Sequence, residues 1–296
     1  MKSSKRILAL LCAAATACAL AACGGNSGAP AASTPAAPAA PAVSAPAGRT
    51  TFTVGFDAEY PPYGFKADDG SYVGFDLDLA QEVCDRNGWE LVRQPIDWDS
   101  KDFELDSGNI DCIWNGFTMT GRTEDYTFVG PYVNNSIMFV VRADSGITEA
   151  SQLAGKPVVT QSGSSALTAL TDDPGDGSND ENLKLAASFS QLDQVPDYNT
   201  AFMNLESGVD DAIAVDIGVA NFQLATRGSD KFAMLEEPLS KEQYGIGFKK
   251  GNTELADQVK ATLDEMWADG TFMKIATAAA ENYDAAELVD MICYGE

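Results

Sequence analysis

From residue 51 onward, runs with the two-residue period of a strand alternate with runs that have the spacing of a helix. TFTVGF, residues 51–56, is the first strand-like run. Residues 75–83 then place apolar side chains on one face of a helix, and Asn87-Gly88 predicts where that helix ends. Residues 91–94 read as the next strand. This order of elements predicts an α/β fold.

The same reading predicts the elements that follow. Further strands are expected at residues 110–114, 137–141, 158–161, 212–215 and 246–248. Helices are expected at residues 164–170, 199–206, 217–225 and 253–268.

One segment of the chain is echoed about a hundred residues later. LDSGNIDCI, residues 105–113, and LESGVDDAI, residues 205–213, share Leu, an acid, Ser, Gly, Asp and Ile in one register. Each reads as a helix end, a glycine cap and a strand, which predicts two similar lobes with parallel strands. Ligands of open α/β sheets lie at the carboxyl ends of strands. That edge would carry Asn115, Gly116 and Thr118 in one lobe and Asp216 in the other.

The first 48 residues are typical of an export signal followed by a tether. A basic start and an apolar run at residues 7–19 form an export signal, and LAAC, Leu20 to Cys23, resembles a bacterial lipobox whose cysteine carries the lipid. An ordinary signal with an incidental cysteine is the alternative. Residues 24–48 carry no charge and are rich in Ala and Pro, which is typical of a semi-extended tether because proline favours extended conformations. We therefore expect a signal peptide at 1–22, an anchor and tether at 23–48, and an extracytoplasmic protein held at the cell membrane.

Composition narrows the function classes. A formal net charge of −25 argues against nucleic acid or an anionic membrane surface as the partner. The absence of histidine excludes Ser-His-Asp triads and the usual zinc-protease motifs. For Cys84 and Cys112, buried thiols are favoured over a disulfide. The acidic segment 171–183 lacks the spacing of a calcium loop, so a surface loop is expected there. No metal or cofactor is predicted.

Six ordered motifs between residues 51 and 270 carry a resemblance to a known family. The motifs are FTVGFDAEYPPYGF (52–65), YVGFDLDLAQEV (72–83), IDWDSKDFELDSGNIDCIWNGFTMTGR (96–122), FVGPYVNN (128–135), VVTQSGSSAL (158–167) and DDAIAVD (210–216). Together they resemble the polar amino-acid-binding proteins of ABC importers, the bacterial extracellular solute-binding proteins of family 3. The resemblance implies a periplasmic-binding-protein-like fold, with two α/β lobes joined by a two-strand hinge and a ligand cleft between them. The first lobe would span 49–140 plus 244–296, and the second 141–243.

The resemblance also implies a binding site for a zwitterion. Arg122 matches the arginine that grips the ligand's α-carboxylate with two hydrogen bonds. Thr118 would add its hydroxyl and amide, and Gly116 a carbonyl to the ammonium group. This chain reads T-G-R where family members often read T-P-E-R, one residue longer, which leaves the reach of Arg122 open. The alternative for Arg122 is a surface salt bridge to Glu124 or Asp125.

Five further residues match family positions in the cleft. Asp216 would neutralise the ligand's ammonium group, although it can equally cap the helix that follows. Ser164 and Ser165 would offer hydroxyls and helix-start amides to the carboxylate. Tyr60 and Trp98 would sandwich the ligand side chain, with ordinary core packing as the alternative.

Asp57 is expected to face the far end of the ligand side chain. With Glu59, Asp97 and Asp99 also negative, and with no basic residue near these motifs to offset their charge, acidic amino acids should be rejected. The expected ligand is a polar neutral or cationic amino acid, with glutamine, cystine and arginine as candidates. The partners would be a permease with its ATPase, and the protein itself a monomer. A dehydratase or lytic transglycosylase on the same fold, or an amino-acid sensor, is the alternative.

Overall fold

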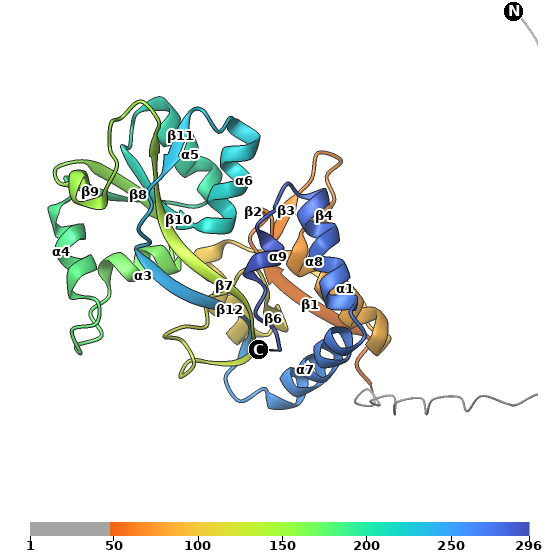
Figure 1. The fold of residues 1–296 in the computed structure, drawn as a ribbon. Coiled ribbons are helices and arrows are strands. Elements are labelled where there is room, and N and C mark those ends of the chain that lie inside the picture. Colours follow the sequence, from red (N-terminus) through yellow and green to blue (C-terminus); the bar gives the residue numbers. More distant parts are fainter. Residues whose placement is uncertain (1–47, 296) are drawn as a thin grey trace, which may run out of the picture. The chain divides into compact units, whose positions relative to one another are not determined.

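Each lobe is built on strands whose apolar residues are covered by helices. In this computed structural model, which describes residues 48–295, β1 (Thr51–Phe56) pairs in parallel with β5 (Glu90–Pro95) and β6 (Cys112–Ile113). The helix α1 (Phe75–Asn87) buries its apolar residues against this sheet, as the helical spacing predicts. We call the part around β1, β5, β6 and α1 the first lobe (Figure 1).

The second lobe repeats this arrangement. Its strands β8 (Pro157–Gln161), β9 (Gln191–Val195) and β10 (Ala212–Asp216) are parallel, with β8 between the other two. Figure 1 shows α3, α4, α5 and α6 gathered around these strands. A separate apolar cluster, which includes Leu153 and Leu170, supports this lobe.

Two long strands join the lobes. β7 (Tyr126–Arg142) and β12 (Ser240–Lys249) run antiparallel to each other, and their register shifts between Tyr244 and Ile246. β12 also pairs with β6 of the first lobe, and β7 pairs with β10 of the second. One hydrogen-bonded sheet therefore continues through both lobes, in the order β5-β1-β6-β12-β7-β10-β8-β9, with β11 (Phe232–Met234) also on β7. The predicted lobe boundaries fall inside β7 and β12 and remain a prediction.

The remaining elements complete the two lobes. A small three-stranded sheet consists of β2 (Glu59–Tyr60), β3 (Gly64–Lys66) and β4 (Tyr72–Val73). The other helices are η1 (Trp98–Ser100), α2 (Lys101–Ser107), η2 (Ala150–Leu153), α3 (Ser165–Thr171), α4 (Asp180–Ser188), α5 (Tyr198–Ser207), α6 (Ile217–Arg227), α7 (Thr253–Ala268), α8 (Thr271–Asn282) and α9 (Leu288–Met291). Of these, α7 and α8 pack against α1, so the C-terminal segment completes the first lobe.

The internal echo has the structure that its residues predict. α2 ends at Ser107 and α5 at Ser207, and each is followed by a glycine in the left-handed conformation, with φ of 77° at Gly108 and 76° at Gly208. After its glycine each segment continues into a strand, which is β6 in the first lobe and β10 in the second. The fold class predicted from the sequence is confirmed.

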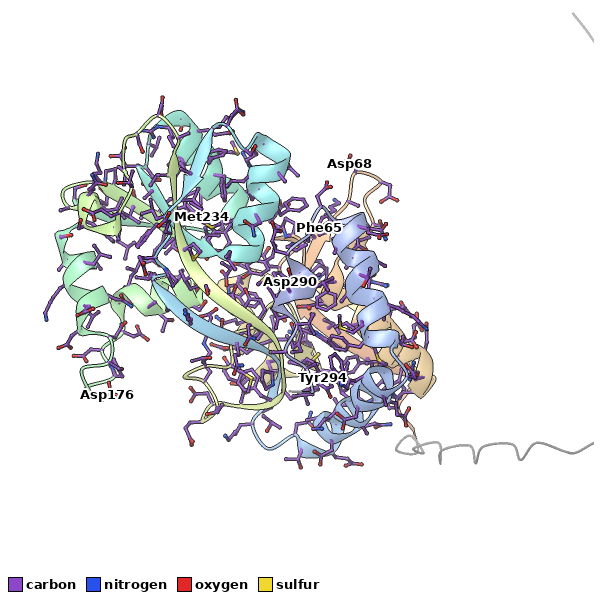
Figure 2. The ribbon with its side chains drawn as sticks, in the orientation of Figure 1. Phe65, Asp68, Asp176, Met234, Asp290 and Tyr294 are labelled. Atoms are coloured by element: carbon purple, nitrogen blue, oxygen red, sulfur yellow. The ribbon has the colours of Figure 1, made fainter. Side chains whose placement is uncertain are left out.

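Differences from the predicted elements lie where the pattern is weak. The strand expected at 137–141 is the end of the 17-residue β7, whose first part carries mixed polar and apolar residues. The expected surface loop at 171–183 is only partly correct, since α3 includes Thr171 and α4 begins at Asp180. Asp176 lies on the loop between them, at the edge of the molecule (Figure 2).

Cys84 and Cys112 are buried and form no disulfide, which confirms the thiol interpretation. Burial raises the pKa of the Cys84 thiol to about 12, so the group is protonated and unreactive at neutral pH. Across residues 48–295, no cluster of three or more metal-ligating side chains occurs, and no helix has the length and apolarity to cross a membrane. The predicted signal, Cys23 and nearly all of the tether lie outside the described residues.

Candidate functional site

Asp216 ends β10 with its carboxylate buried between the lobes. Asp216 stands at the N-cap position of α6, but its side chain makes no capping hydrogen bond to that helix. Instead Oδ1 accepts from the Tyr244 hydroxyl and from Asn135 Nδ2, both at 2.7 Å, and Oδ2 accepts from the Tyr198 hydroxyl at 3.4 Å. Burial raises the pKa of Asp216, and the hydrogen bonds from Tyr244 and Asn135 oppose that shift. All three of these partners are neutral.

Glu242, on β12, is a second buried acid beside Asp216. Its Oε1 accepts from the Thr118 hydroxyl at 2.7 Å, from Asn135 Nδ2 at 2.8 Å and from the Ser165 hydroxyl at 3.1 Å. Burial, followed by the charge of Asp216, raises the pKa of Glu242 to about 7. Asn135 donates to both acids and links them, so two carboxylates face one small space.

Thr118 and Ser165 lie together here, as the sequence predicts, but Ser164 does not join them. The Ser164 hydroxyl caps α3 by accepting from Leu167 N at 3.1 Å, and it donates to Gln161 O at 2.7 Å. The single proton of this hydroxyl is thus donated to Gln161 in this structure, and the predicted contact of Ser164 with a ligand carboxylate stays a prediction.

Asn115 and Gly116 follow β6 of the first lobe. Gly116 has a φ of 56°, and a Cβ there would lie 2.9 Å from the Tyr60 ring and 3.0 Å from the Tyr244 ring. Its amide donates to Asp76 Oδ2 at 2.6 Å, which leaves its carbonyl for the predicted role. Asn115 Oδ1 accepts from Asp57 N at 3.0 Å, and Asn115 Nδ2 is buried with no hydrogen-bond partner.

The two predicted aromatic residues face each other. The rings of Tyr60 and Trp98 are nearly parallel, at 10°, with centroids 6.4 Å apart. An aliphatic or amide group between two rings needs about 7 Å, twice a carbon–carbon contact. The space between the rings is thus slightly narrower than a sandwich requires. Tyr60 also contacts Tyr198 of the second lobe, with ring centroids 6.0 Å apart.

Asp57 contacts the second lobe directly. Its Oδ2 accepts from Gln161 Nε2 at 2.5 Å, and its Oδ1 accepts from Glu59 N at 2.8 Å. Burial raises the pKa of Asp57 to about 6, and both hydrogen bonds oppose that shift. A ligand that pairs with Asp57 would have to replace or join Gln161.

Arg122 makes no salt bridge to Glu124, to Asp125 or to any other acid that the structure describes, so the surface-salt-bridge alternative is not observed. Its guanidinium lies 5.1 Å from the centroid of the Phe117 ring, and its NH1 donates weakly to Thr118 O at 3.5 Å. It borders a hollow of about 610 Å³ that Thr118, Ser165 and Glu242 also line. The arginine is therefore free to bind an anion.

Lys101 corrects the expectation that no basic residue lies near these motifs. It opens α2, three residues after Trp98, and is buried with 6% of its surface exposed. Its Nζ donates to Gly163 O of the second lobe at 3.1 Å and lies 5.4 Å from the centroid of the Trp98 ring. The premise on which acidic ligands were excluded is thus wrong.

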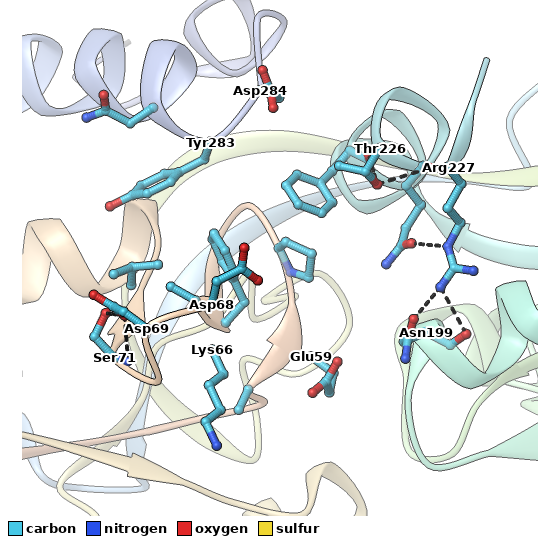
Figure 3. A pocket seen from close by; sticks show the side chains of 18 residues that line it. Glu59, Lys66, Asp68, Asp69, Ser71, Asn199, Thr226, Arg227, Tyr283 and Asp284 are labelled. Carbon is cyan, nitrogen blue, oxygen red and sulfur yellow. Dashed lines mark hydrogen bonds between the residues drawn. The ribbon is translucent and has the colours of Figure 1, made fainter.

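A separate hollow of about 690 Å³ lies between the small sheet and α6. Figure 3 shows Lys66, Asp68 and Asp69 on one side and Arg227 on the other, with Arg227 bonded to Asn199 and Gln223. Of the predicted ligand-binding residues, none lines this hollow, so its size does not make it the candidate site.

The sequence did not single out Lys101, Asn135, Gln161, Glu242 or Tyr244, although the structure places all five at the predicted site. Asn135, Gln161 and Lys101 lie inside motifs that resemble the family, and a search for polar residues at strand ends would have found Gln161, which ends β8, but not Asn135, which lies inside β7. Glu242 and Tyr244 belong to β12, whose predicted strand began only at residue 246.

Comparison with known proteins identifies the family. The family model described as bacterial extracellular solute-binding proteins, family 3, matches residues 52–279. The L-cystine-binding protein TcyJ of Escherichia coli strain K12 is 30% identical over 231 residues, which cover 77% of this chain and 82% of that protein. The glutamate-binding protein GluB of Corynebacterium efficiens is 26% identical over 295 residues, covering 93% and 92%.

A solved structure agrees with these relatives. An ABC uptake transporter substrate-binding protein from Streptococcus pneumoniae, crystallised with bound histidine, has a TM-score of 0.72 and 33% identity, and the match covers 79% of this chain and 94% of that one. The motifs, the two-lobed sheet and the matched model lead to one conclusion: this chain belongs to the bacterial extracellular solute-binding proteins of family 3.

Proposed function

We propose that this protein captures a polar amino acid outside the cytoplasm and delivers it to the permease and ATPase of an ABC importer. Its relatives are substrate-binding proteins whose names specify cystine, glutamate or arginine, and a related structure holds histidine. What these ligands share is the α-amino-acid group, in which an ammonium and a carboxylate are bonded to the same carbon.

One observation carries the proposal: the two lobes offer opposite charges, and neither charge is neutralised by an ion pair within the described residues. Asp216 belongs to the second lobe and bonds only to neutral groups. Arg122 follows β6 of the first lobe and makes no salt bridge there. A zwitterion that pairs with both would bridge the lobes and favour their closed arrangement.

The hydroxyls of Thr118 and Ser165 would complete the carboxylate end of this site. Both donate to Glu242 at present. Ligand binding would thus replace one carboxylate by another at these two hydroxyls, or place both there with a shared proton. Glu242 can hold a proton near neutral pH because burial and the charge of Asp216 raise its pKa to about 7.

Binding without turnover is the proposed activity. The buried acids are explained as charge partners of a zwitterion, whereas an enzyme of the dehydratase or transglycosylase type needs a carboxylate placed for proton transfer. Incubation with amino acids and prephenate-like acids, followed by mass spectrometry, separates the two functions. A new product formed in proportion to protein and time would establish an enzyme.

Extracytoplasmic attachment through Cys23 and a monomeric state belong to the same proposal. The support for the anchor is the LAAC sequence and the uncharged spacer after it, together with the family's extracellular location. A lipid and a long tether would hold the binding domain near its permease without fixing its orientation.

Replacing Arg122 by Ala tests the function. The variant should fold but bind its amino acid about 2 to 5 kcal/mol more weakly, because the ligand carboxylate loses a charged partner. Calorimetry measures the affinity after thermal-shift screening of the common amino acids has found the ligand. Arg86→Ala is the matched control, since Arg86 pairs with Glu82 and Asp269 away from the site. Equal affinities for Arg122→Ala and the parent protein would contradict the proposed role.

A further inference from the structure

Lys101 is a buried cation whose hydrogen-bond partners are main-chain carbonyls. Besides Gly163 O, its Nζ reaches Trp98 O at 3.5 Å. None of the acids in residues 48–295 lies within ion-pair distance of it. A buried ammonium group without a carboxylate partner is expensive, and such groups are normally paired.

The surrounding charges do not neutralise the ammonium group of Lys101. Burial lowers the pKa of Lys101; the negative Asp102 and Asp99 oppose that shift and the positive Arg122 adds to it. Asp102 accepts a hydrogen bond from the Tyr126 hydroxyl, so its charge is partly engaged elsewhere. Arg122 and Lys101 are therefore neighbouring cations at the same cleft.

The position of Lys101 places it at the side-chain end of the proposed site. Its ammonium group lies next to the Trp98 ring that faces Tyr60. It contacts Gly163, in the loop that starts at Gln161, the residue bound by Asp57. The same segment of the second lobe thus contacts the acid Asp57 through Gln161 and the base Lys101 through Gly163.

We propose that Lys101 is a specificity-determining residue that selects an amino acid carrying a second carboxylate. This inference rests on the proposed function and names its substrate class. The α-carboxylate binds Arg122, and the second carboxylate takes Lys101 as its partner in place of the Gly163 carbonyl. Two kinds of ligand share this chemistry: acidic amino acids such as glutamate, and double-headed amino acids such as cystine, whose second ammonium group would face Asp57.

The test compares ligands on the parent protein and on Lys101→Met. Calorimetry is run with glutamate, cystine, glutamine and arginine. The parent should bind glutamate or cystine more tightly than glutamine, and Lys101→Met should reduce that preference by about 50-fold, as expected when a buried charged partner is lost. Lys249→Met, which changes an exposed lysine on β12, should leave the preference intact. Thermal melts confirm that each variant is folded, and Lys101→Gln replaces Lys101→Met if the latter is not.

The outcomes separate three cases. If Lys101 only holds the lobes together, Lys101→Met weakens every ligand equally, and the specificity role is wrong. Tightest binding of arginine or glutamine by the parent likewise overturns this inference while leaving the proposed function intact. If none of the common amino acids nor cystine binds, the proposed function itself fails.

Asp57→Asn distinguishes the two ligand sources. Cystine should lose affinity because its second ammonium group loses a charged partner, whereas glutamate should gain because a nearby like charge is removed. A cation such as arginine, if it binds at all, should lose far more affinity than a neutral ligand.

Discussion

At the scale of single residues, the site is notable for three buried acids, Asp57, Asp216 and Glu242, that bond only to neutral groups within the described part of the chain. Their pKa values are all raised, first of all by burial. Protein groups that are buried at such a cost are commonly functional. Here an ammonium group from the ligand would supply the missing positive charge.

The buried carboxyl group of Glu242 should make the stability of the folded protein depend on pH. Its pKa is raised from an ordinary value of 4.5 to about 7, so between these values the folded protein binds more protons than the unfolded chain. Stability should therefore fall as pH rises from about 4.5 to about 7 and level off above that. Asp57 and Asp76, whose pKa values rise to about 6 and about 7, act in the same direction.

Glu242→Gln should weaken that dependence without abolishing it. The amide keeps an oxygen that can accept from Thr118 and Ser165, but it carries no charge to desolvate. Above pH 7 the variant should be more stable than the parent by roughly 1 to 3 kcal/mol, and near pH 4.5 the two should differ little. Urea denaturation across this pH range measures both. Parallel curves for parent and variant would show that Glu242 does not titrate in the folded protein.

At the scale of elements, the echo of α2–β6 in α5–β10 is the feature that the sequence predicts best. Its glycines leave the helix in the left-handed conformation, which only glycine adopts without strain. No side chain or main-chain atom lies within 4 Å of a Cβ built on Gly108, so the space around it is open. The role of Gly108 is thus conformational and not a matter of packing.

Replacing Gly108 by Ala should cost about 1 kcal/mol of unfolding free energy, from backbone strain alone. Gly208→Ala, with the same φ, should cost a similar amount, since the nearest atom is the flexible end of Arg142 at 3.7 Å. Gly251→Ala is a third case with a positive φ, but it lies in the turn after β12 and tests turn strain without a helix cap. A difference of several kcal/mol between Gly108→Ala and Gly208→Ala would mean that the two units are not equivalent.

The same scale shows where sequence reasoning stops. Helix α7 begins and ends at the predicted residues because its apolar spacing is regular over four turns. β7 and β12 were found only as fragments, because their patterns change where each strand passes from one lobe to the other. Glu242 was not predicted as a site residue for that reason. Lys101 was not predicted because nothing in the sequence shows that a lysine at the start of a helix is buried by a loop 62 residues later.

At the scale of the whole molecule, the lobes already touch through the chain's own side chains. Asp57 bonds Gln161, Lys101 bonds Gly163, and Tyr60 packs on Tyr198. These contacts lie on the residues that the ligand is proposed to engage. A bound ligand would therefore compete with these contacts between the lobes for some of the same groups. This competition would keep the free energy gained on closure moderate and allow the ligand to be released to a permease.

The predicted lipid attachment at Cys23 is tested on the full chain. Cys23→Ser should leave the fold and amino-acid affinity unchanged but move the protein from the membrane fraction to the soluble extracytoplasmic fraction, because the lipid-bearing thiol is lost. Fractionation followed by immunoblotting measures this, with Cys84→Ser as a control that retains Cys23. Quantitative membrane retention of Cys23→Ser would show that another feature attaches the protein.

The continuous sheet also determines the order in which the chain can fold as it is made. β1, β5 and β6 are synthesised before the strands of the second lobe, yet β6 has β12 as its partner on one side, and α1 is covered by α7 and α8. Those partners, β12, α7 and α8, lie within residues 240–282 and follow β10 in the sequence, so the first lobe stays incomplete until that segment has been made. The second lobe has its strands β8, β9 and β10 within a stretch of sixty residues, 157–216. A chain that emerges from its N-terminus would thus close its second lobe before its first, and the amino-acid site, which needs both, would be the last part to form.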